Sequence, residues 1–177
     1  LTLRTFHAGG VAGVDITAGL PRVEEIFECR TIKNPALVNK YAGTVSEIKQ
    51  EGGDKIISIL SSESTAKKES VDYVVNPHRV AIVKVGQEVV GGELLTDGSA
   101  NIEEVYEFGG REMAEDYIIR EISKVYELQG ASIARKHLEI IVRQMFSRRK
   151  VKDAGDTAFS IGDVIEVTDL IEENAKM

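Results

Sequence analysis

The stretch KVGQEVVGGELL, residues 84–95, decides the fold of the middle of this chain once it is set beside GTVSEI at residues 43–48. Apolar and polar residues alternate in GTVSEI, which is typical of a strand with one buried face. The run at residues 55–60 alternates in the same way, and residues 52–54, Gly-Gly-Asp, supply a turn between the two runs. The sequence therefore predicts two strands joined by a turn.

Further strands are predicted at residues 70–75 and 80–85, so residues 36–98 are expected to form a β-rich module. The glycine-containing runs of this module resemble the half-repeats of a barrel-sandwich hybrid, the fold of lipoyl and biotinyl carrier domains. A carrier domain needs a lysine at a hairpin tip within a carrier motif. Lys55 is the candidate in the sequence, but its flanking residues do not match such a motif. A purely structural module is therefore favoured over a carrier.

The last third of the chain changes to a helical period. Apolar side chains recur three or four positions apart in residues 110–129 and again from Ala134 to about Arg149. The two stripes are Ala114, Ile118, Ile122 and Val125, and Leu138, Ile141, Val142 and Met145. They predict an αα-hairpin, joined across Gly130 and packed on the β-rich module. A strand at residues 164–167 and a final helix capped by Thr168 complete an α+β fold.

Three side chains near the start of the chain have complementary chemistry. If residues 1–7 are helical, Leu3, Arg4 and His7 project from one face, because residues three and four apart are neighbours on a helix. An apolar contact, a permanent cation and an imidazole suit a base or sugar that carries a phosphate chain. The alternative from spacing alone is a frayed helical end whose Arg4 and His7 are solvated.

Charge is unevenly distributed along the chain, although the formal net charge is −7. Residues 97–121 carry eight acids against two arginines, whereas residues 135–152 carry seven cations against one acid. Such a local excess of cations can neutralise phosphates, and aromatic side chains for stacking on single strands are not interleaved with it. Duplex backbone contact is therefore the predicted function, and a solvated basic helix end is the alternative. The candidates for phosphate contact are Arg143, Arg148, Arg149, Lys150 and Lys152.

The composition limits the classes of protein to which the chain can belong. A hydrophobic content of 42% and a charged content of 29% are ordinary for a soluble globular domain. No apolar run approaches the roughly 20 residues that span a bilayer, so no membrane partner is expected. Cys29 stands alone, which excludes a disulfide framework and fits a reducing cytosol. His78 and His137 lack metal-ligand spacing, so the sequence predicts no metal site.

Four motifs follow one another along the chain: LTLRTFHAGG at residues 1–10, DITAGLPRVEEIFECR at residues 15–30, ARKHLEIIVRQM at residues 134–145 and DAGDT at residues 153–157. Together they resemble the bacterial RNA polymerase β′ subunit family. The resemblance covers nearly the whole chain and is far more specific than a lone glycine motif. It implies that the chain is an internal piece of that subunit.

The resemblance also implies four segments. They are the C-terminal half of the trigger loop with a linker at residues 1–20, a short helix and connection at residues 21–35, a β-rich jaw module at residues 36–98, and a helical hairpin with a short strand and a C-terminal helix at residues 99–177. Beyond the trigger loop, the resemblance implies the jaw and part of the clamp base.

The resemblance further implies a catalytic role for the N-terminal segment. In this family the trigger loop folds over the active site when the matched nucleoside triphosphate binds. Leu3, which stands where many members have Met, would contact the incoming base. Arg4 and His7 would stabilise charge that develops on the triphosphate. Whether His7 donates a proton or only a positioning hydrogen bond stays open.

Partners and cofactors follow from the same resemblance. The expected partners are the other polymerase subunits (β, α and the rest of β′), downstream duplex DNA and a nucleoside triphosphate, in the cytoplasm at the nucleoid. No cofactor is expected in this chain, because the family's NADFDGD motif, which holds the catalytic Mg²⁺, is absent from it. The chain alone is therefore predicted to be inactive.

A second hypothesis comes from a different class of protein. The chain would be a free-standing barrel-sandwich module whose basic helical hairpin binds nucleic acid or protein. Under that hypothesis Arg4 and His7 are dispensable. Under the polymerase hypothesis, a substitution of either residue in the full enzyme slows nucleotide addition.

Overall fold

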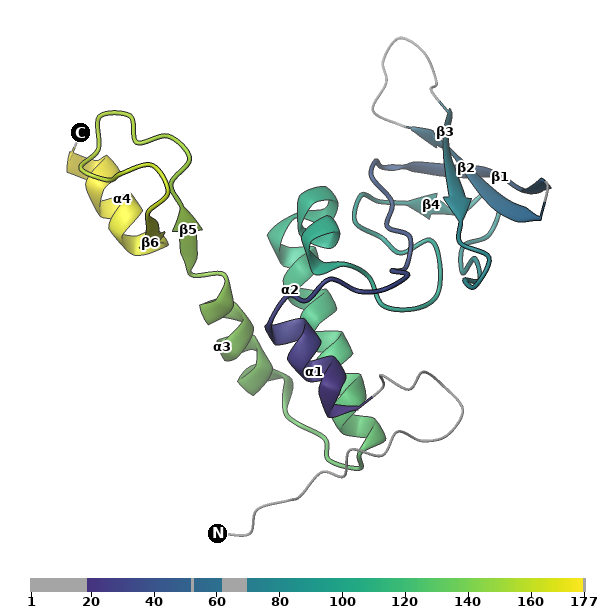
Figure 1. The fold of residues 1–177 in the computed structure, drawn as a ribbon, viewed down its shortest axis with the longest axis horizontal. Helices are drawn as coiled ribbons and strands as arrows, with labels where there is room; N and C mark the ends of the chain where they lie inside the picture. Colours follow the sequence, from purple (N-terminus) through teal and green to yellow (C-terminus); the bar gives the residue numbers. More distant parts are fainter. Residues whose placement is uncertain (1–18, 52, 62–69, 177) are drawn as a thin grey trace. The chain divides into compact units, whose positions relative to one another are not determined.

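The computed structural model of the chain describes residues 19–51, 53–61 and 70–176. The chain divides into two compact units, Leu1–Ala131 and Ser132–Met177, and each is considered by itself. The described elements of the first unit (Figure 1) are α1 (Leu20–Phe27), β1 (Gly43–Glu51), β2 (Asp54–Ser61), β3 (Ser70–Val75), β4 (Glu88–Val89) and α2 (Ile102–Leu128). Those of the second unit are α3 (Arg135–Met145), β5 (Arg148–Lys150), β6 (Val164–Glu166) and α4 (Val167–Lys176).

The four strands of the first unit form one antiparallel sheet in the order β3-β2-β1-β4. A tight turn joins β1 to β2, where Glu51 pairs with Asp54 and Gly53 has a φ of 101°. This left-handed backbone conformation favours glycine, because a side chain would be strained there. Three of the predicted strands are confirmed, at residues 43–48, 55–60 and 70–75.

The strand predicted at residues 80–85 is wrong. Within that run only Ala81 makes a bridge, with Thr96, and the fourth strand of the sheet is β4. The backbone of the run bonds to the segment just before α2: Ile82 N–H donates to the Leu95 carbonyl. Its alternating pattern therefore reflects packing on one side of a loop segment, without pairing to β1, β2 or β3.

The sheet buries one apolar cluster on its inner face. The cluster consists of Val45, Ile57, Ile59, Tyr73, Val75, Val83, Val89 and Leu95. Ile57 and Ile59 of β2, and Tyr73 and Val75 of β3, are two positions apart, as expected for strands with one buried face. A polar group is enclosed beside it: Asn39 is fully buried, and its Nδ2 donates to the carbonyls of Tyr41 and Val90 at 2.7 and 3.0 Å.

Helix α2 begins earlier than predicted and is interrupted by a glycine. Asn101 caps it by accepting a hydrogen bond from Glu103 N–H at 3.1 Å, and Gly110 breaks the helical conformation with a φ of 77°. The interruption lies beside a close backbone approach. A Cβ at Gly92 would lie 2.4 Å from the Cα of Gly109, so only glycine fits there.

The second part of α2 carries the predicted apolar stripe. Ala114, Ile118, Ile122 and Val125 are all buried, which confirms this prediction. The short helix predicted after Pro21 is α1, and it packs on α2. The buried face of α1 contains Val23 and Ile26.

The second unit combines two helices with a two-stranded ribbon. Strands β5 and β6 pair antiparallel, and α4 follows β6 directly, so the predicted strand and final helix are confirmed. The predicted cap is wrong: α4 begins at Val167, so Thr168 lies within the helix. The helix predicted to end near Arg149 ends at Met145 instead. The Ser147 hydroxyl donates to the Gln144 carbonyl at 2.8 Å and satisfies one of the last carbonyls, after which the chain enters β5.

The α+β fold class is confirmed by this set of helices and strands. The two helices of the predicted αα-hairpin are present, but α2 lies in the first unit and α3 in the second, so their mutual packing stays a prediction. The barrel-sandwich resemblance and the four segment boundaries stay predictions as well. Within the described ranges, no helix is both long and apolar enough to cross a bilayer.

Candidate functional site

The catalytic candidates Leu3, Arg4 and His7 lie outside the described residues. Their roles therefore stay predictions. The structure does place the five basic candidates, and it separates them by element: Arg143 is on α3, Arg148, Arg149 and Lys150 form β5, and Lys152 follows β5.

Successive residues of a strand point to opposite faces, which divides the basic side chains of β5. Arg148 and Lys150 share one face and are exposed, whereas Arg149 on the other face is partly buried. Arg149 Nη1 donates to the Phe146 carbonyl at 3.0 Å and to the Arg148 carbonyl at 2.9 Å. Arg149 is thus used to hold the turn between α3 and β5, while Arg148 and Lys150 are presented to solvent.

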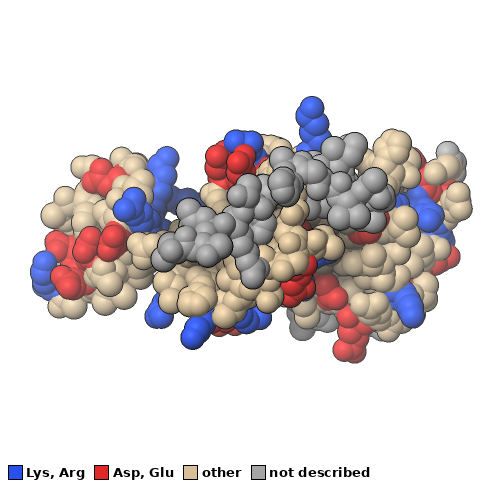
Figure 2. All heavy atoms as spheres, turned by 90° about the horizontal axis from the view of Figure 1, so that it is seen from below, with Lys and Arg blue, Asp and Glu red and all other residues tan. Residues whose placement is uncertain are grey.

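The charge of the second unit changes sign along the chain. Seven of its eight Lys and Arg residues lie between residues 135 and 152, and seven acids lie between residues 153 and 173. Across the ribbon, Glu166 pairs in register with Arg148 and offsets part of its charge. Figure 2 likewise shows cationic and anionic side chains interspersed over one face of the molecule. The second unit therefore does not present a uniformly basic surface.

A buried arginine fixes α1 against α2 in the first unit. The side chain of Arg22 is 5% exposed, and it contacts Glu25 Oε2 at 3.3 Å and Glu121 Oε2 at 3.7 Å. Arg22 Nη2 also donates to the hydroxyl of Tyr117 at 3.3 Å, and that hydroxyl accepts from Ala100 N–H at 2.7 Å. The sequence offers no periodic signal for this cluster, because its members come from three separate segments of the chain.

Tyr117 of this cluster has a raised pKa, and its burial is the main cause. Desolvation, with the nearby carboxylate of Glu121, raises the pKa of Tyr117. The neutral phenol is therefore favoured at neutral pH, where it donates and accepts hydrogen bonds. The contacts of Arg22 with Tyr117 and Glu121 connect α1 to α2, and we assign these residues a structural role.

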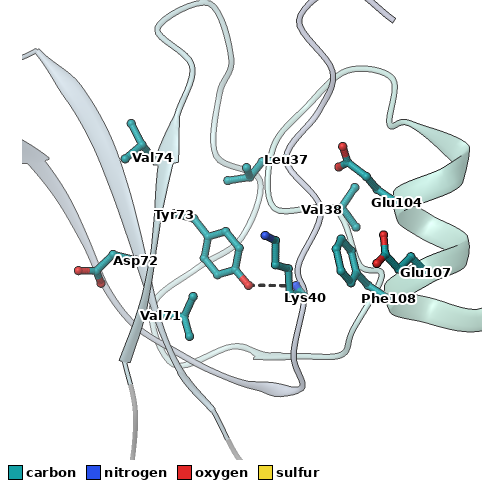
Figure 3. A pocket seen from close by; sticks show the side chains of 10 residues that line it. All are labelled: Leu37, Val38, Lys40, Val71, Asp72, Tyr73, Val74, Glu104, Glu107 and Phe108. Atoms are coloured by element: carbon teal, nitrogen blue, oxygen red, sulfur yellow. Dashed lines mark hydrogen bonds between the residues drawn. The ribbon is translucent and has the colours of Figure 1, made fainter. Parts of the chain in front are cut away.

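A hollow of about 520 Å³ lies between β3 and the first part of α2 (Figure 3). Lys40 extends between Tyr73 on one side and Phe108 on the other, and its Nζ lies 5.6 Å from the centre of the Phe108 ring. The backbone N–H of Lys40 donates to the Tyr73 hydroxyl at 3.0 Å. Glu104 and Glu107 of α2 stand beside Phe108.

The remaining wall of the hollow is apolar. It is formed by Leu37, Val38 and Val71. Asp72 and Val74 point away from it, to the other face of β3 (Figure 3). The Tyr73 hydroxyl accepts from the backbone N–H of Lys40 and donates to Asn39 Oδ1, so both hydrogen bonds hold it in a structural role. No sequence motif could have revealed the hollow, because three distant segments build it.

Two other sequence predictions concern metal binding and a carrier lysine. Among the described residues, no group of three or more His, Cys, Asp or Glu side chains is placed to hold a metal ion. Lys55 is the second residue of β2 and pairs with Gln50 and Val75. It therefore lies within a paired strand of the sheet, and its flanks still lack a carrier motif.

Comparison with known proteins gives the family. The sequence profile of the family described as RNA polymerase Rpb1, domain 5, matches residues 1–168, which is nearly the whole chain. The chain belongs to the RNA polymerase Rpb1 domain 5 family. The match includes the N-terminal motif, α1, the four-stranded sheet, α2, α3 and the β5–β6 ribbon.

Bacterial relatives of this polymerase family agree along the full length of the chain. The chain is 44% identical over 177 residues to a protein of Symbiobacterium thermophilum named DNA-directed RNA polymerase subunit beta′, with all of the chain and 15% of the relative covered. It is 43% identical over 176 residues to the protein of that name from Acetivibrio thermocellus, covering 99% of the chain and 15% of the relative. The resemblance of the four sequence motifs to the bacterial β′ family is thereby confirmed.

The chain spans only about 15% of the length of these curated relatives. A more distant member, from Acholeplasma laidlawii, is 41% identical over 178 residues and is covered to 13%. Most of a β′ subunit therefore lies beyond the region that this Rpb1 domain 5 chain represents.

Proposed function

We propose that the chain works as part of the β′ subunit of a bacterial DNA-directed RNA polymerase. Its first residues would close over the incoming nucleoside triphosphate, and its remaining residues would form the jaw and part of the clamp base, which hold downstream duplex DNA. The observation that supports this proposal best is the family match over residues 1–168. The relatives named DNA-directed RNA polymerase subunit beta′ support it along the whole chain.

The proposed role of the N-terminal segment is to gate and stabilise nucleotide addition. Leu3 contacts the incoming base, and Arg4 and His7 bind the triphosphate oxygens, where charge develops as pyrophosphate leaves. Closure around the matched substrate assembles these groups only when pairing is correct. Mg²⁺ would supply electrophilic assistance in the whole enzyme, held by residues outside this chain. Alone, the chain is expected to be inactive.

The proposed role of the exposed basic side chains of the second unit is contact with phosphates of downstream DNA. Arg143, Arg148, Lys150 and Lys152 are all exposed, so their side chains can reach a duplex backbone. Arg149 is assigned the structural role that its two backbone hydrogen bonds indicate. The remaining proposed partners are the other polymerase subunits and the rest of the β′ subunit, because this chain covers only about 15% of a β′ relative.

The test is to measure nucleotide addition by the intact enzyme with a substituted β′ subunit. Arg4→Ala and His7→Ala should each slow addition of the matched nucleotide on the order of ten- to a hundred-fold, because each removes a donor that acts in the transition state. Thr5→Ala, a neighbouring substitution on another face of the predicted helix, is the matched control and should have little effect.

Unchanged addition rates in Arg4→Ala and His7→Ala would contradict the proposal and leave the free-standing module as the better hypothesis. Equal slowing by Thr5→Ala would indicate general disruption of the segment and contradict the specific roles.

A further inference from the structure

Helix α3 presents apolar side chains on two different faces. Leu138 and Val142 are buried, 4% and 1% exposed, and form the inner face. Ile140 and Ile141 are nevertheless 68% and 48% exposed. At 100° per residue, Ile140 projects about 160° away from Val142 and Leu138, so it cannot join their face. A short helix with two exposed isoleucines beside a complete inner face has a second apolar surface.

This second surface is hollowed. Ile140, Ile141, Gln144 and Met145 line a depression of about 510 Å³. The four residues are two adjacent pairs, four positions apart, so they stand on successive turns with a groove between them. Such a groove receives the side-chain ridge of another helix. We call these four residues the Ile140 face.

The border of the Ile140 face is cationic. Lys136 and Arg143 are seven positions apart, both are exposed, and both project within about 60° of Ile140. The acid on α3, Glu139, is already paired with Arg135 at 2.7 Å. An apolar groove with cations along one side favours a partner whose apolar stripe is bordered by carboxylates.

We propose that the Ile140 face docks an amphipathic helix of a protein partner, with an aliphatic side chain in the groove and Asp or Glu residues facing Lys136 and Arg143. A helix fits better than duplex DNA, because phosphate contacts would leave the two isoleucines in water. The face lies on α3 alone, so the proposal does not depend on the role of the N-terminal segment. It assigns Arg143 to the partner helix in place of DNA and leaves Arg148, Lys150 and Lys152 for the duplex.

The test uses the whole 177-residue chain and two synthetic helical peptides. The peptides share one leucine stripe and differ only in flanking residues, Glu in one and Lys in the other. NMR of labelled Ile and Met methyl groups detects weak binding and reports its location. The Glu peptide should shift the signals of Ile140, Ile141 and Met145 and bind more tightly than the Lys peptide.

Variants then test the contacts. Ile140→Ser should weaken the Glu peptide roughly ten-fold, because it removes most of an aliphatic side chain from the contact. Arg143→Gln should weaken it a few-fold. Ile82→Ser is the matched control, because Ile82 is an exposed isoleucine too (55%) but lies in the other unit. This substitution should not change the affinity. Both Ile140 and Arg143 are exposed, and thermal melting checks that each variant stays folded.

Three results would overturn the proposal. They are failure of the Glu peptide to bind, equal affinity for both peptides, and an unchanged affinity in both Ile140→Ser and Arg143→Gln. A duplex oligonucleotide that shifted the same three methyl signals more strongly than the Glu peptide would assign the face to nucleic acid instead.

Discussion

Gly92 shows how much a single position without a side chain contributes to this fold. Its φ is +84°, and a Cβ there would collide with the backbone of Gly109. Gly86 has nearly the same φ, +85°, but open space around it. The two glycines therefore separate backbone strain from close packing.

Gly92→Ala should destabilise the first unit more than Gly86→Ala. Each substitution costs about 1–2 kcal/mol for a left-handed residue with a side chain. Gly92→Ala should add about 1–3 kcal/mol, because the turn and α2 must move apart. Chemical denaturation of the two variants measures the difference. Equal losses of stability would mean that the close approach has no energetic importance.

Tyr117 makes a prediction about pH. Burial raises its pKa in the folded chain, so above pH 10 the unfolded chain releases the phenolic proton while the folded chain retains it. Its contribution to stability is thus complete below about pH 10 and is lost as the pH rises through the folded-state pKa.

Tyr117→Phe should lower stability at neutral pH by about 1–3 kcal/mol, because the buried Ala100 N–H loses its acceptor and Arg22 loses one of its partners. Above about pH 10 the variant should lose stability less steeply than the wild type, since phenylalanine does not ionise. Denaturation series from neutral pH to about pH 11 measure both slopes. Parallel slopes would show that Tyr117 does not cause the alkaline loss.

At the scale of the element, β5 determines which cations are available. Its alternation exposes Arg148 and Lys150 and turns Arg149 back onto the chain. If the exposed pair binds phosphates, the double variant Arg148→Ala, Lys150→Ala should reduce the slope of log affinity against log salt by about 0.9 for each phosphate that the variant no longer neutralises.

Arg149→Ala is the matched control for the double variant. It should leave the salt slope unchanged and lower stability by about 1 kcal/mol, because two backbone carbonyls lose a donor. Duplex affinity measured at several salt concentrations gives the slopes. A larger slope change in Arg149→Ala than in the double variant would contradict this division of roles.

The sequence could predict elements better than the use of individual side chains. Alternation located β1 to β3, and the helical period located α2 and α3, because burial on one face leaves a local pattern. The distinction between Arg149 and its neighbours was not predictable, since the basic run was expected to end a helix. Helix α3 ends at Met145, and the register of β5 then decides which way each side chain of the basic run points.

The hollow between β3 and α2 shows a second limit. Lys40, Tyr73 and Phe108 come together only through the tertiary fold, and none of them carries a local signal. The N-terminal candidates Leu3, Arg4 and His7 were found by resemblance, and their roles stay a prediction.

At the scale of the whole molecule, the two units differ in how much they bury. Among the described residues, Leu138 and Val142 are the buried apolar side chains of the second unit, whereas α2 alone buries eight residues. Local stability follows the burial of apolar side chains, so the units should open separately.

Amide hydrogen exchange of the isolated chain should therefore be faster in α3 than in residues 111–128 of α2. Mass spectrometry of peptic peptides measures both segments in one sample. Equal protection of the two helices, falling together in denaturant, would contradict separate opening and indicate one cooperative structure.

The meeting of Gly92 and Gly109 also has an evolutionary consequence. The two backbones touch, so a mutation that adds a side chain at either position requires a compensating shift at the other. The two positions are therefore expected to change together, although 16 residues lie between them in the sequence. A lineage that changed one alone would have to rebuild the joint between the sheet and α2.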